Sequence, residues 1–158
     1  MHPMRRKDRQ TGEEAVRRLL EEGEYGVLSL LTPEGTPYGV PLTYAAQGDS
    51  PLVLYMHCAR DGRKLECLRA CARAHFVVVG PTRVVPQEFT IEYESVMLEG
   101  RIEEVVDAAE KRHGLLALAQ KYAAGFDGAA YADAAGNATR VLRLTVESLS
   151  GKRLQVAK

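Results

Sequence analysis

The sequence predicts a mainly β protein, a small β-barrel with α-helices at its periphery. Short apolar runs rich in β-branched and aromatic residues follow one another with turn residues between them, as over residues 25–58. Helical periodicity recurs at three places along the chain. A doubly wound dinucleotide fold is excluded, because the first three predicted strands follow one another without intervening helices.

The N-terminal third is expected to hold one helix and three strands. Thr11 and Glu14 have the spacing of a capping box, and the helix that they begin is expected to end at Gly23. Pro41 lies inside the second strand. Proline cannot donate to a β-ladder, so this position is expected to be a sheet edge, a bulge or a break facing a ligand. The strands are expected over residues 25–32, 38–46 and 52–58.

The rest of the chain is expected to add two helices and the remaining strands. A helix follows Gly62, because Leu65, Leu68 and Ala72 recur at helical spacing. Asp107 begins another helix, which runs to about Tyr122. Residues 123–138 are expected to form a loop that can include a helical turn. Strands are expected over 73–80, 89–106, 139–146 and 152–156, with 82–86 a connector or short strand and 148–151 a break.

Length and composition limit the classes of function that the protein can have. The 158 residues predict a single domain over 1–158. Lysines plus arginines number 21, equal to aspartates plus glutamates, and this balance argues against a general nucleic-acid binder. No apolar run is long enough to cross a membrane, and the basic start lacks the apolar core of a secretory signal. Three cysteines make a disulfide framework improbable, so a cytoplasmic location is expected.

The segment around Gly62 is the best candidate for a phosphate site. Here a buried strand is expected to end and a helix to begin, with Arg63 and Lys64 in its first turn. Helix N-termini attract anions and disfavour cations, so two cations at this end favour a bound phosphate. The alternative is a solvated first turn of a surface helix.

His57 lies at the predicted end of the strand before that turn. It could hydrogen-bond a ligand or donate a proton. The alternative is a buried histidine whose nitrogens are satisfied by the backbone. The preceding apolar residues 54–56 would suit a flat aromatic ring.

Other candidates are weaker. Tyr93 and Ser95 share one face of the long strand, and either line a cleft or form the wet face of a barrel strand. The segment 37–42 either offers backbone groups to a heteroaromatic edge or is simply a sheet edge. The chain contains no nucleophile elbow for a serine hydrolase. A metal site is not expected, because the spacing lacks the close pairs of structural zinc sites: Cys58, Cys67, Cys71 and His75.

Four blocks of the sequence, taken in order, resemble the flavin-binding split-barrel superfamily named after pyridoxamine 5′-phosphate oxidase. Within it, the nitroimidazole-resistance branch is the most similar. The resemblance covers residues 4 to about 122. The blocks are residues 4–9, the hairpin of 25–29 with 36–42, the segment from His57 to Lys64, and residues 85–96.

This resemblance implies a six-stranded antiparallel split barrel that forms a homodimer, with FMN bound between the subunits. It implies an FMN-dependent oxidoreductase acting on nitroaromatic or similar small acceptors, with His57 as the catalytic residue. Arg63 and Lys64, with Gly62, would hold the phosphate, and Tyr93 and Ser95 would contribute from the same or the other subunit. The flavin would be lined by Val40, Pro41, Leu42, Thr43, His57, Cys58 and Ala59.

In two places the sequence departs from the pattern of this superfamily. The C-terminal segment 152–158 lacks the arginine-leucine-x-proline ending of true pyridoxamine phosphate oxidases, which argues against vitamin B6 oxidation. Residues 72–74 lack an asparagine-proline pair often found there. The rival interpretation is a carrier or sensor without turnover that binds a flavin or haem, since some relatives bind haem or a deazaflavin.

Overall fold

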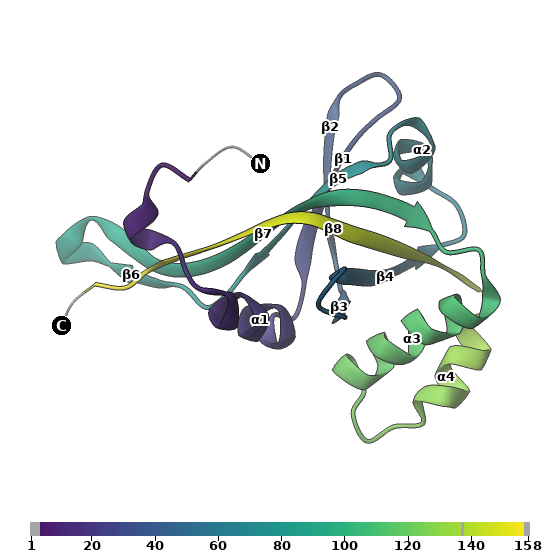
Figure 1. The fold of residues 1–158 in the computed structure, drawn as a ribbon. Helices are drawn as coiled ribbons and strands as arrows, with labels where there is room; N and C mark the ends of the chain where they lie inside the picture. Colours follow the sequence, from purple (N-terminus) through teal and green to yellow (C-terminus); the bar gives the residue numbers. More distant parts are fainter. Residues whose placement is uncertain (1–3, 137, 157–158) are drawn as a thin grey trace.

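The computed structural model describes residues 4–136 and 138–156, and it confirms the mainly antiparallel β class. These residues form eight strands rather than the six expected, with four α-helices and two short 3₁₀ helices (Figure 1). The elements are η1 Lys7–Arg9, α1 Glu13–Glu22, β1 Gly26–Leu31, β2 Pro37–Leu42, β3 Ala45–Gln47, β4 Val53–Ala59, α2 Arg63–Ala70, β5 Arg73–Val79, β6 Arg83–Val85, η2 Pro86–Glu88, β7 Thr90–Glu104, α3 Ala108–Tyr122, α4 Gly128–Ala135 and β8 Thr139–Leu154.

The strands form a sheet that bends round on itself. Its order is β2-β1-β5-β7-β8-β4-β3, every neighbouring pair is antiparallel, and β6 pairs with the start of β7. Its end strands, β2 and β3, are separated in the chain by just Thr43 and Tyr44. The two edges must therefore lie close together, which gives an incompletely closed barrel. Pro41 lies on the edge strand β2, which confirms the edge interpretation of that proline.

Residues along each strand alternate between the inside and the outside of the barrel, and the inward-facing apolar side chains form the core. In β4, Leu54, Met56 and Cys58 point into the barrel and join its main hydrophobic cluster. The ring of Phe76, on β5, packs edge-on against Tyr44 with 5.2 Å between centroids, and both residues are fully buried. The hydroxyl of Tyr44 donates to the carbonyl of Leu20, which ties α1 to the barrel.

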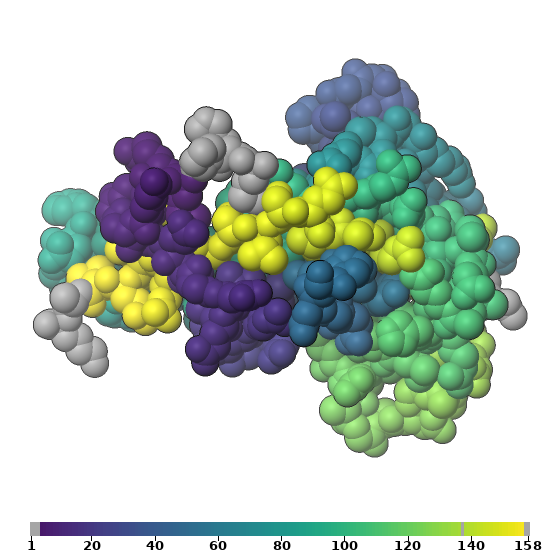
Figure 2. All heavy atoms as spheres, viewed as in Figure 1, coloured from purple at the N-terminus to yellow at the C-terminus, as the bar shows by residue number. Residues whose placement is uncertain are grey.

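Two parts lie outside the barrel, at opposite ends of the β7–β8 ribbon (Figures 1 and 2). At one end β6, η2 and the start of β7 form a projecting hairpin, which we call the arm (residues 83–92). At the other end α3 and α4 pack together. None of the helices in the described ranges is both long enough and apolar enough to span a bilayer.

Near the N-terminus, two expectations are corrected. Gly12, not Thr11, is the N-cap of α1, and no side chain caps this helix end. The Thr11 amide instead donates to the carbonyl of Gly151, on β8. The strand expected over 38–46 is divided into β2 and β3, because the chain turns at Tyr44 to bury that ring.

Two further expectations fail in the C-terminal part. Residues 123–138 contain the helix α4, whose N-terminus is capped by the Asp127 carboxylate, which accepts hydrogen bonds from the amides of Ala129 and Ala130. Strand β8 runs unbroken through residues 148–151. Its pairing with β7 supplies the hydrogen bonds there, and a bulge at Glu99/Gly100 absorbs the irregularity.

Candidate functional site

His57 points away from the barrel interior, toward α3. Its neighbours Met56 and Cys58 face inward, so strand alternation turns the imidazole to the outer face of β4. There it lines a cavity of about 310 Å³ whose other walls come from α3, α4 and the segment between β2 and β3. Carbon-rich side chains and two half-exposed tyrosines dominate the lining: Thr43, His57, Leu118, Ala119, Tyr122, Ala123 and Tyr131.

The imidazole of His57 is not satisfied in the way that a structural histidine would be. Its Nδ1 atom is buried and has no hydrogen-bond partner within the part of the chain that the structure describes. Burial lowers the pKa of His57 below its ordinary value of 6.5. The ring is therefore neutral at pH 7, with one nitrogen that can donate and one that can accept. An unpaired buried nitrogen beside an apolar cavity is costly and fits a position that contacts a ligand.

Helix α3 is held over the outer face of β4 and β8 by a polar cluster. The carboxylate of Glu110 accepts from the Tyr55 hydroxyl at 3.1 Å and from the Arg143 guanidinium at 2.7 Å. Arg143 also contacts Glu103 at 2.9 Å. The side chain of Asp107 caps α3 by accepting from the Glu110 amide at 2.8 Å. One wall of the cavity is thus fixed to β8 and to β4, the strand that carries His57.

Tyr122 fixes the opposite rim. Its hydroxyl accepts from the Tyr44 amide at 3.0 Å and lies 2.7 and 2.8 Å from the carbonyls of Glu24 and Tyr44. These contacts hold the backbone between β2 and β3, and so place Thr43 at the mouth of the cavity.

Lys121 lies beside this rim, where its ammonium group contacts an aromatic ring and a backbone carbonyl. Its ammonium is 3.8 Å from the centroid of the Tyr44 ring and donates to the Leu20 carbonyl at 2.9 Å. Burial lowers the pKa of Lys121 to about 8, opposed by the nearby charge of Glu21. The unfolded chain therefore binds the proton more tightly than the folded chain between about pH 8 and pH 10.5.

The contribution of Lys121 to the free energy of unfolding should therefore increase as the pH rises. Between pH 7 and pH 9.5 the free energy of unfolding should increase by about 1 kcal/mol relative to Lys121→Met, after allowance for solvent screening of a half-buried group. Urea denaturation of both proteins at the two pH values measures the difference. A constant difference would show that Lys121 titrates normally.

The start of α2 has the features of an anion site. Gly62, its N-cap, adopts φ 128°, and no atom lies within 4 Å of where a Cβ would stand. Arg63 is exposed and stacks over the Tyr38 ring at 4.8 Å. Lys64 is half-buried, and its charge acts on the Cys58 thiol, whose pKa is raised chiefly by burial. Both cations therefore follow directly on an open glycine turn.

The residues predicted to line the flavin ring lie on β2, on β4 and in the segment between β2 and β3. On β2, Val40 and Leu42 pack against the barrel core, whereas Pro41 is exposed, so the three side chains do not share one face. On β4, Cys58 faces the core and Ala59 is exposed at the strand end. Of the residues predicted to line a flavin ring, the structure brings Thr43 and His57 together in one cavity.

Tyr93 and Ser95 lie elsewhere in the same protomer. Tyr93 pairs with Leu154, near one end of β8, whereas His57 pairs with Val141, near the other. At 3.3 Å per residue the two rows are about 40 Å apart along the ribbon. This separation favours a contribution of Tyr93 and Ser95 from a second subunit over one from the same subunit, and their role at the site stays a prediction.

Sequence reasoning missed the cavity wall formed by α3 and α4. Helix α3 was predicted, but which of its faces meets β4 depends on tertiary packing. The alanine-rich sequence of α4 was interpreted as a loop, although Asp127 followed by a run of alanines is a helix-start signal.

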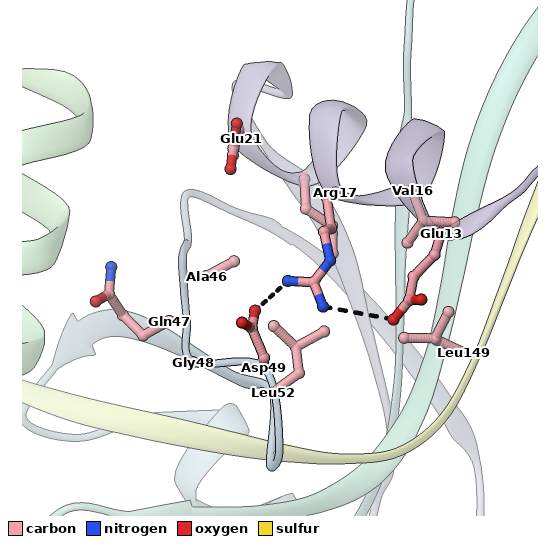
Figure 3. Close-up of a pocket in the computed structure, with 11 residues that line it drawn as sticks. Glu13, Val16, Arg17, Glu21, Ala46, Gln47, Gly48, Asp49, Leu52 and Leu149 are labelled. Carbon is pink, nitrogen blue, oxygen red and sulfur yellow. Dashed lines mark hydrogen bonds and ion pairs between the residues drawn. The ribbon is translucent and has the colours of Figure 1, made fainter.

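A second cavity, of about 210 Å³, lies between α1 and the turn linking β3 to β4 (Figure 3). Arg17 extends over it and is paired with the carboxylates of Asp49 and Glu13. None of the predicted site residues lines this cavity. Because its arginine is already paired with two acidic groups, it is a poorer candidate for an anionic ligand than the α2 turn.

The described residues offer no suitable group of ligands for a metal site. In the described ranges, no three His, Cys, Asp or Glu side chains are placed to hold an ion. Cys58 and Cys67 are buried free thiols, and Cys71 is a half-buried one.

Comparison with known proteins gives a family match and several similar folds. The model of the pyridoxamine 5′-phosphate oxidase family matches residues 12–153. A putative 5-nitroimidazole antibiotic resistance protein from Bacteroides thetaiotaomicron is 23% identical, with a TM-score of 0.75, over 97% of this chain and 96% of that one. No curated protein sequence matches the chain significantly.

Two other solved structures share the fold. A conserved hypothetical protein from Mycobacterium tuberculosis has a TM-score of 0.79 at 16% identity, over 99% of this chain and 98% of that one. An FAD- and haem-binding protein from Mycobacterium smegmatis has a TM-score of 0.77 at 23% identity, over 94% of this chain and 74% of that one. At such identities the likeness establishes the fold.

Proposed function

The chain belongs to the pyridoxamine 5′-phosphate oxidase family, and on this premise we propose that it is an FMN-dependent oxidoreductase that reduces small nitroaromatic or similar acceptors. One observation carries the proposal: His57 lines an apolar cavity while its buried Nδ1 atom has no partner among the described residues, and the chain runs from there directly into a cationic helix start. The similar folds support it, since one is a putative nitroimidazole resistance protein and another binds FAD and haem.

The residues present suit a flavin phosphate at the α2 turn. Gly62 leaves open space where a side chain would stand, no side chain of the described residues caps this helix end, and Lys64 adds a charge beside it. Arg63, held by cation–π contact with Tyr38, supplies a second charge. These three residues would hold the phosphate.

The residues that line the His57 cavity would orient the flavin ring and contact the electron acceptor. When bound, the flavin supplies the hydride or electron chemistry. Leu118 and Ala119 exclude water from one side of the cavity, and Thr43 lies at its mouth. His57 holds a neutral imidazole there at pH 7, which can hydrogen-bond a group reduced beside it, and at lower pH its imidazolium can protonate that group.

Removing the Lys64 charge should weaken flavin binding. Lys64→Ala is expected to raise the dissociation constant for FMN about 5- to 150-fold, equivalent to a loss of about 1–3 kcal/mol for a charged hydrogen bond. Fluorescence titration of the apoprotein measures the affinity. Arg69→Ala is the matched control, because it removes an exposed cation from the last turn of the same helix. Equal affinities of the two variants would remove Lys64 from the site.

We extend the proposal to a homodimer. The outer face of the sheet exposes large apolar side chains that nothing in the described ranges covers, and Val79 and Met97 are 55% and 43% exposed. Exposed apolar patches of this kind mark association surfaces. A second copy would cover them and could bring its Tyr93 and Ser95 toward the first copy's cavity. The free thiols are compatible with the reducing cytoplasm that we propose as its location.

A haem-binding carrier is the second candidate. His57 presents a neutral imidazole at an apolar cavity, and such an imidazole is also a ligand that haem iron accepts. The visible spectrum of the purified protein separates the two, since a haem Soret band would replace the two flavin bands. A haem spectrum that disappears in His57→Ala would support the carrier.

A further inference from the structure

Another cavity, of about 490 Å³, adjoins the His57 cavity, because Thr43 and Tyr122 line both. Its remaining walls come from α1, the residues that follow α1, and the last turn of α3. We call it the Lys121 cavity, since Lys121 supplies the one amine among its described lining residues. The lining is Glu21, Glu22, Glu24, Tyr25, Thr43, Lys121 and Tyr122.

The amine of Lys121 is held at the wall of this cavity without a counter-ion. It donates to the Leu20 carbonyl at 2.9 Å and lies 3.8 Å from the centroid of the Tyr44 ring. Among the described residues no carboxylate forms an ion pair with it, although the charge of Glu21 is near enough to act on it. The nitrogen is therefore fixed in position and its charge is not neutralised by a partner.

Partial burial favours the neutral form of this amine. It lowers the pKa of Lys121 to about 8, and the charge of Glu21 acts in the opposite direction. At pH 7.5 about a quarter of these amines then have a free lone pair, against about a thousandth for an ordinary lysine. A desolvated lysine with a free lone pair is the nucleophile with which proteins bind carbonyl compounds covalently. The other ionisable side chains around the amine line the same cavity or contact the amine: Glu22, Glu24, Tyr25, Tyr44 and Tyr122.

The walls of the Lys121 cavity select the kind of carbonyl compound that fits. Tyr25 and Tyr122 are 57% and 41% exposed and offer aromatic surfaces to a planar molecule. Three carboxylates, those of Glu21, Glu22 and Glu24, outnumber the single amine, so an anionic electrophile is repelled. A neutral aromatic aldehyde satisfies both conditions.

We infer that Lys121 is a covalent binding site for neutral aromatic aldehydes, which it holds as imines. The lone pair of Nζ attacks the carbonyl carbon, and one amine proton passes to the carbonyl oxygen, which gives a carbinolamine. The new hydroxyl leaves with the second amine proton as water, and a C=N bond remains. The step consumes no oxidant or reductant, so it is independent of a bound flavin and of the proposed function.

Reductive trapping tests for this imine. The purified protein is treated at pH 7.5 with limiting benzaldehyde and sodium cyanoborohydride, and the benzylated positions among its six lysines are mapped by peptide mass spectrometry. Lys121 is expected to be labelled at least roughly tenfold faster than Lys111, because more of its amine is neutral. Lys111 is the matched control: it is also half-buried on α3 and donates to a backbone carbonyl, that of Gly136, but it does not line this cavity. Labelling of Lys121 no faster than that of Lys111 would overturn the inference.

The charge of the aldehyde tests the chemical class that we assign. 4-Carboxybenzaldehyde is anionic at this pH, and the ratio of Lys121 to Lys111 labelling should be at least roughly threefold lower with it than with benzaldehyde. In 1 M NaCl this difference should shrink, since the Debye length falls to about 3 Å. Equal ratios for the two aldehydes at low salt would contradict the preference for a neutral compound.

Two variants separate a nucleophilic lysine from a structural one. Lys121→Arg keeps the positive charge and a donor for the Leu20 carbonyl but cannot form an imine, so the fast phase of benzylation should disappear while the circular dichroism spectrum is unchanged. A fast phase that persists in this variant would refute the site. Glu21→Gln removes one of the repelling carboxylates and should increase labelling of Lys121 by 4-carboxybenzaldehyde. No increase would count against the part assigned to the carboxylates.

Discussion

Replacing His57 with alanine is expected to slow reduction of the acceptor by roughly 10²- to 10⁴-fold, the usual contribution of a positioned general acid or base. Flavin affinity should change little, because the phosphate residues lie on α2 and are untouched. The sharpest assay uses protein whose flavin has been reduced chemically under anaerobic conditions. Its reoxidation by a nitroimidazole, followed by stopped-flow absorbance, needs no knowledge of the physiological electron donor.

Two controls make the result specific. His75→Ala removes another half-buried histidine, on β5, which does not pair with β4, and should leave the reoxidation rate within about threefold of the wild type. Imidazole added to His57→Ala should restore part of the rate by occupying the space left in the cavity. A His57→Ala protein that binds FMN and reoxidises at the wild-type rate would show that His57 takes no part in the chemistry.

The pH dependence offers a second test of the same residue. Since burial lowers the pKa of His57 below 6.5, the imidazole gains its proton only below that pH. If the imidazolium donates to the acceptor, the wild-type rate should rise as the pH falls below 6.5, and His57→Ala should lack this rise.

Replacing Phe76 with alanine is expected to reduce the free energy of unfolding by about 3–5 kcal/mol. The Phe76 ring is fully buried and packs at 71° against Tyr44, the residue around which the chain turns from β2 to β3. Its removal leaves a cavity where the sheet closes, next to the backbone that positions Thr43. Urea denaturation, with the midpoint and slope fitted together, measures the loss.

Phe126→Ala is the matched control, because this phenylalanine is 83% exposed, and its stability should stay within about 0.5 kcal/mol of the wild type. Phe76→Leu, expected to lose about 1–2 kcal/mol, keeps the test measurable if Phe76→Ala does not fold. A loss below 1 kcal/mol in Phe76→Ala would mean that the barrel closes without this contact.

Local patterns were sufficient for much of the architecture. Alternation of apolar residues placed β1, β4, β5 and the long β7 close to their observed bounds, and the helical spacing after Gly62 predicted α2. Proline at position 41 predicted an edge, a bulge or a break facing a ligand, and β2 is an edge strand. These features follow from the two-residue and 3.6-residue periods of the chain, which are properties of neighbouring residues.

Long-range pairing overruled local preference in other places. The segment 148–151 has turn-forming residues, yet β8 passes straight through it because β7 lies alongside and pairs with it. A Cβ at Gly151 would overlap Thr11, so this glycine serves close packing and not a turn. Residues 128–135 lack an apolar stripe, and their helix is stabilised by its cap and by packing on α3.

The sequence by itself determined the barrel class and the residues His57, Gly62, Arg63 and Lys64 as a candidate site, because each of these rests on local pattern and spacing. Its resemblance to a known family, carried by four blocks in order, indicated the family. Tertiary structure alone decided that α3 and α4 wall the His57 cavity, that Lys121 lies over Tyr44, and that Tyr93 is about 40 Å away along the ribbon. The physical reason is that a cavity is made by surfaces from distant parts of the chain. Their meeting depends on how the whole sheet curves, which no short stretch of residues encodes.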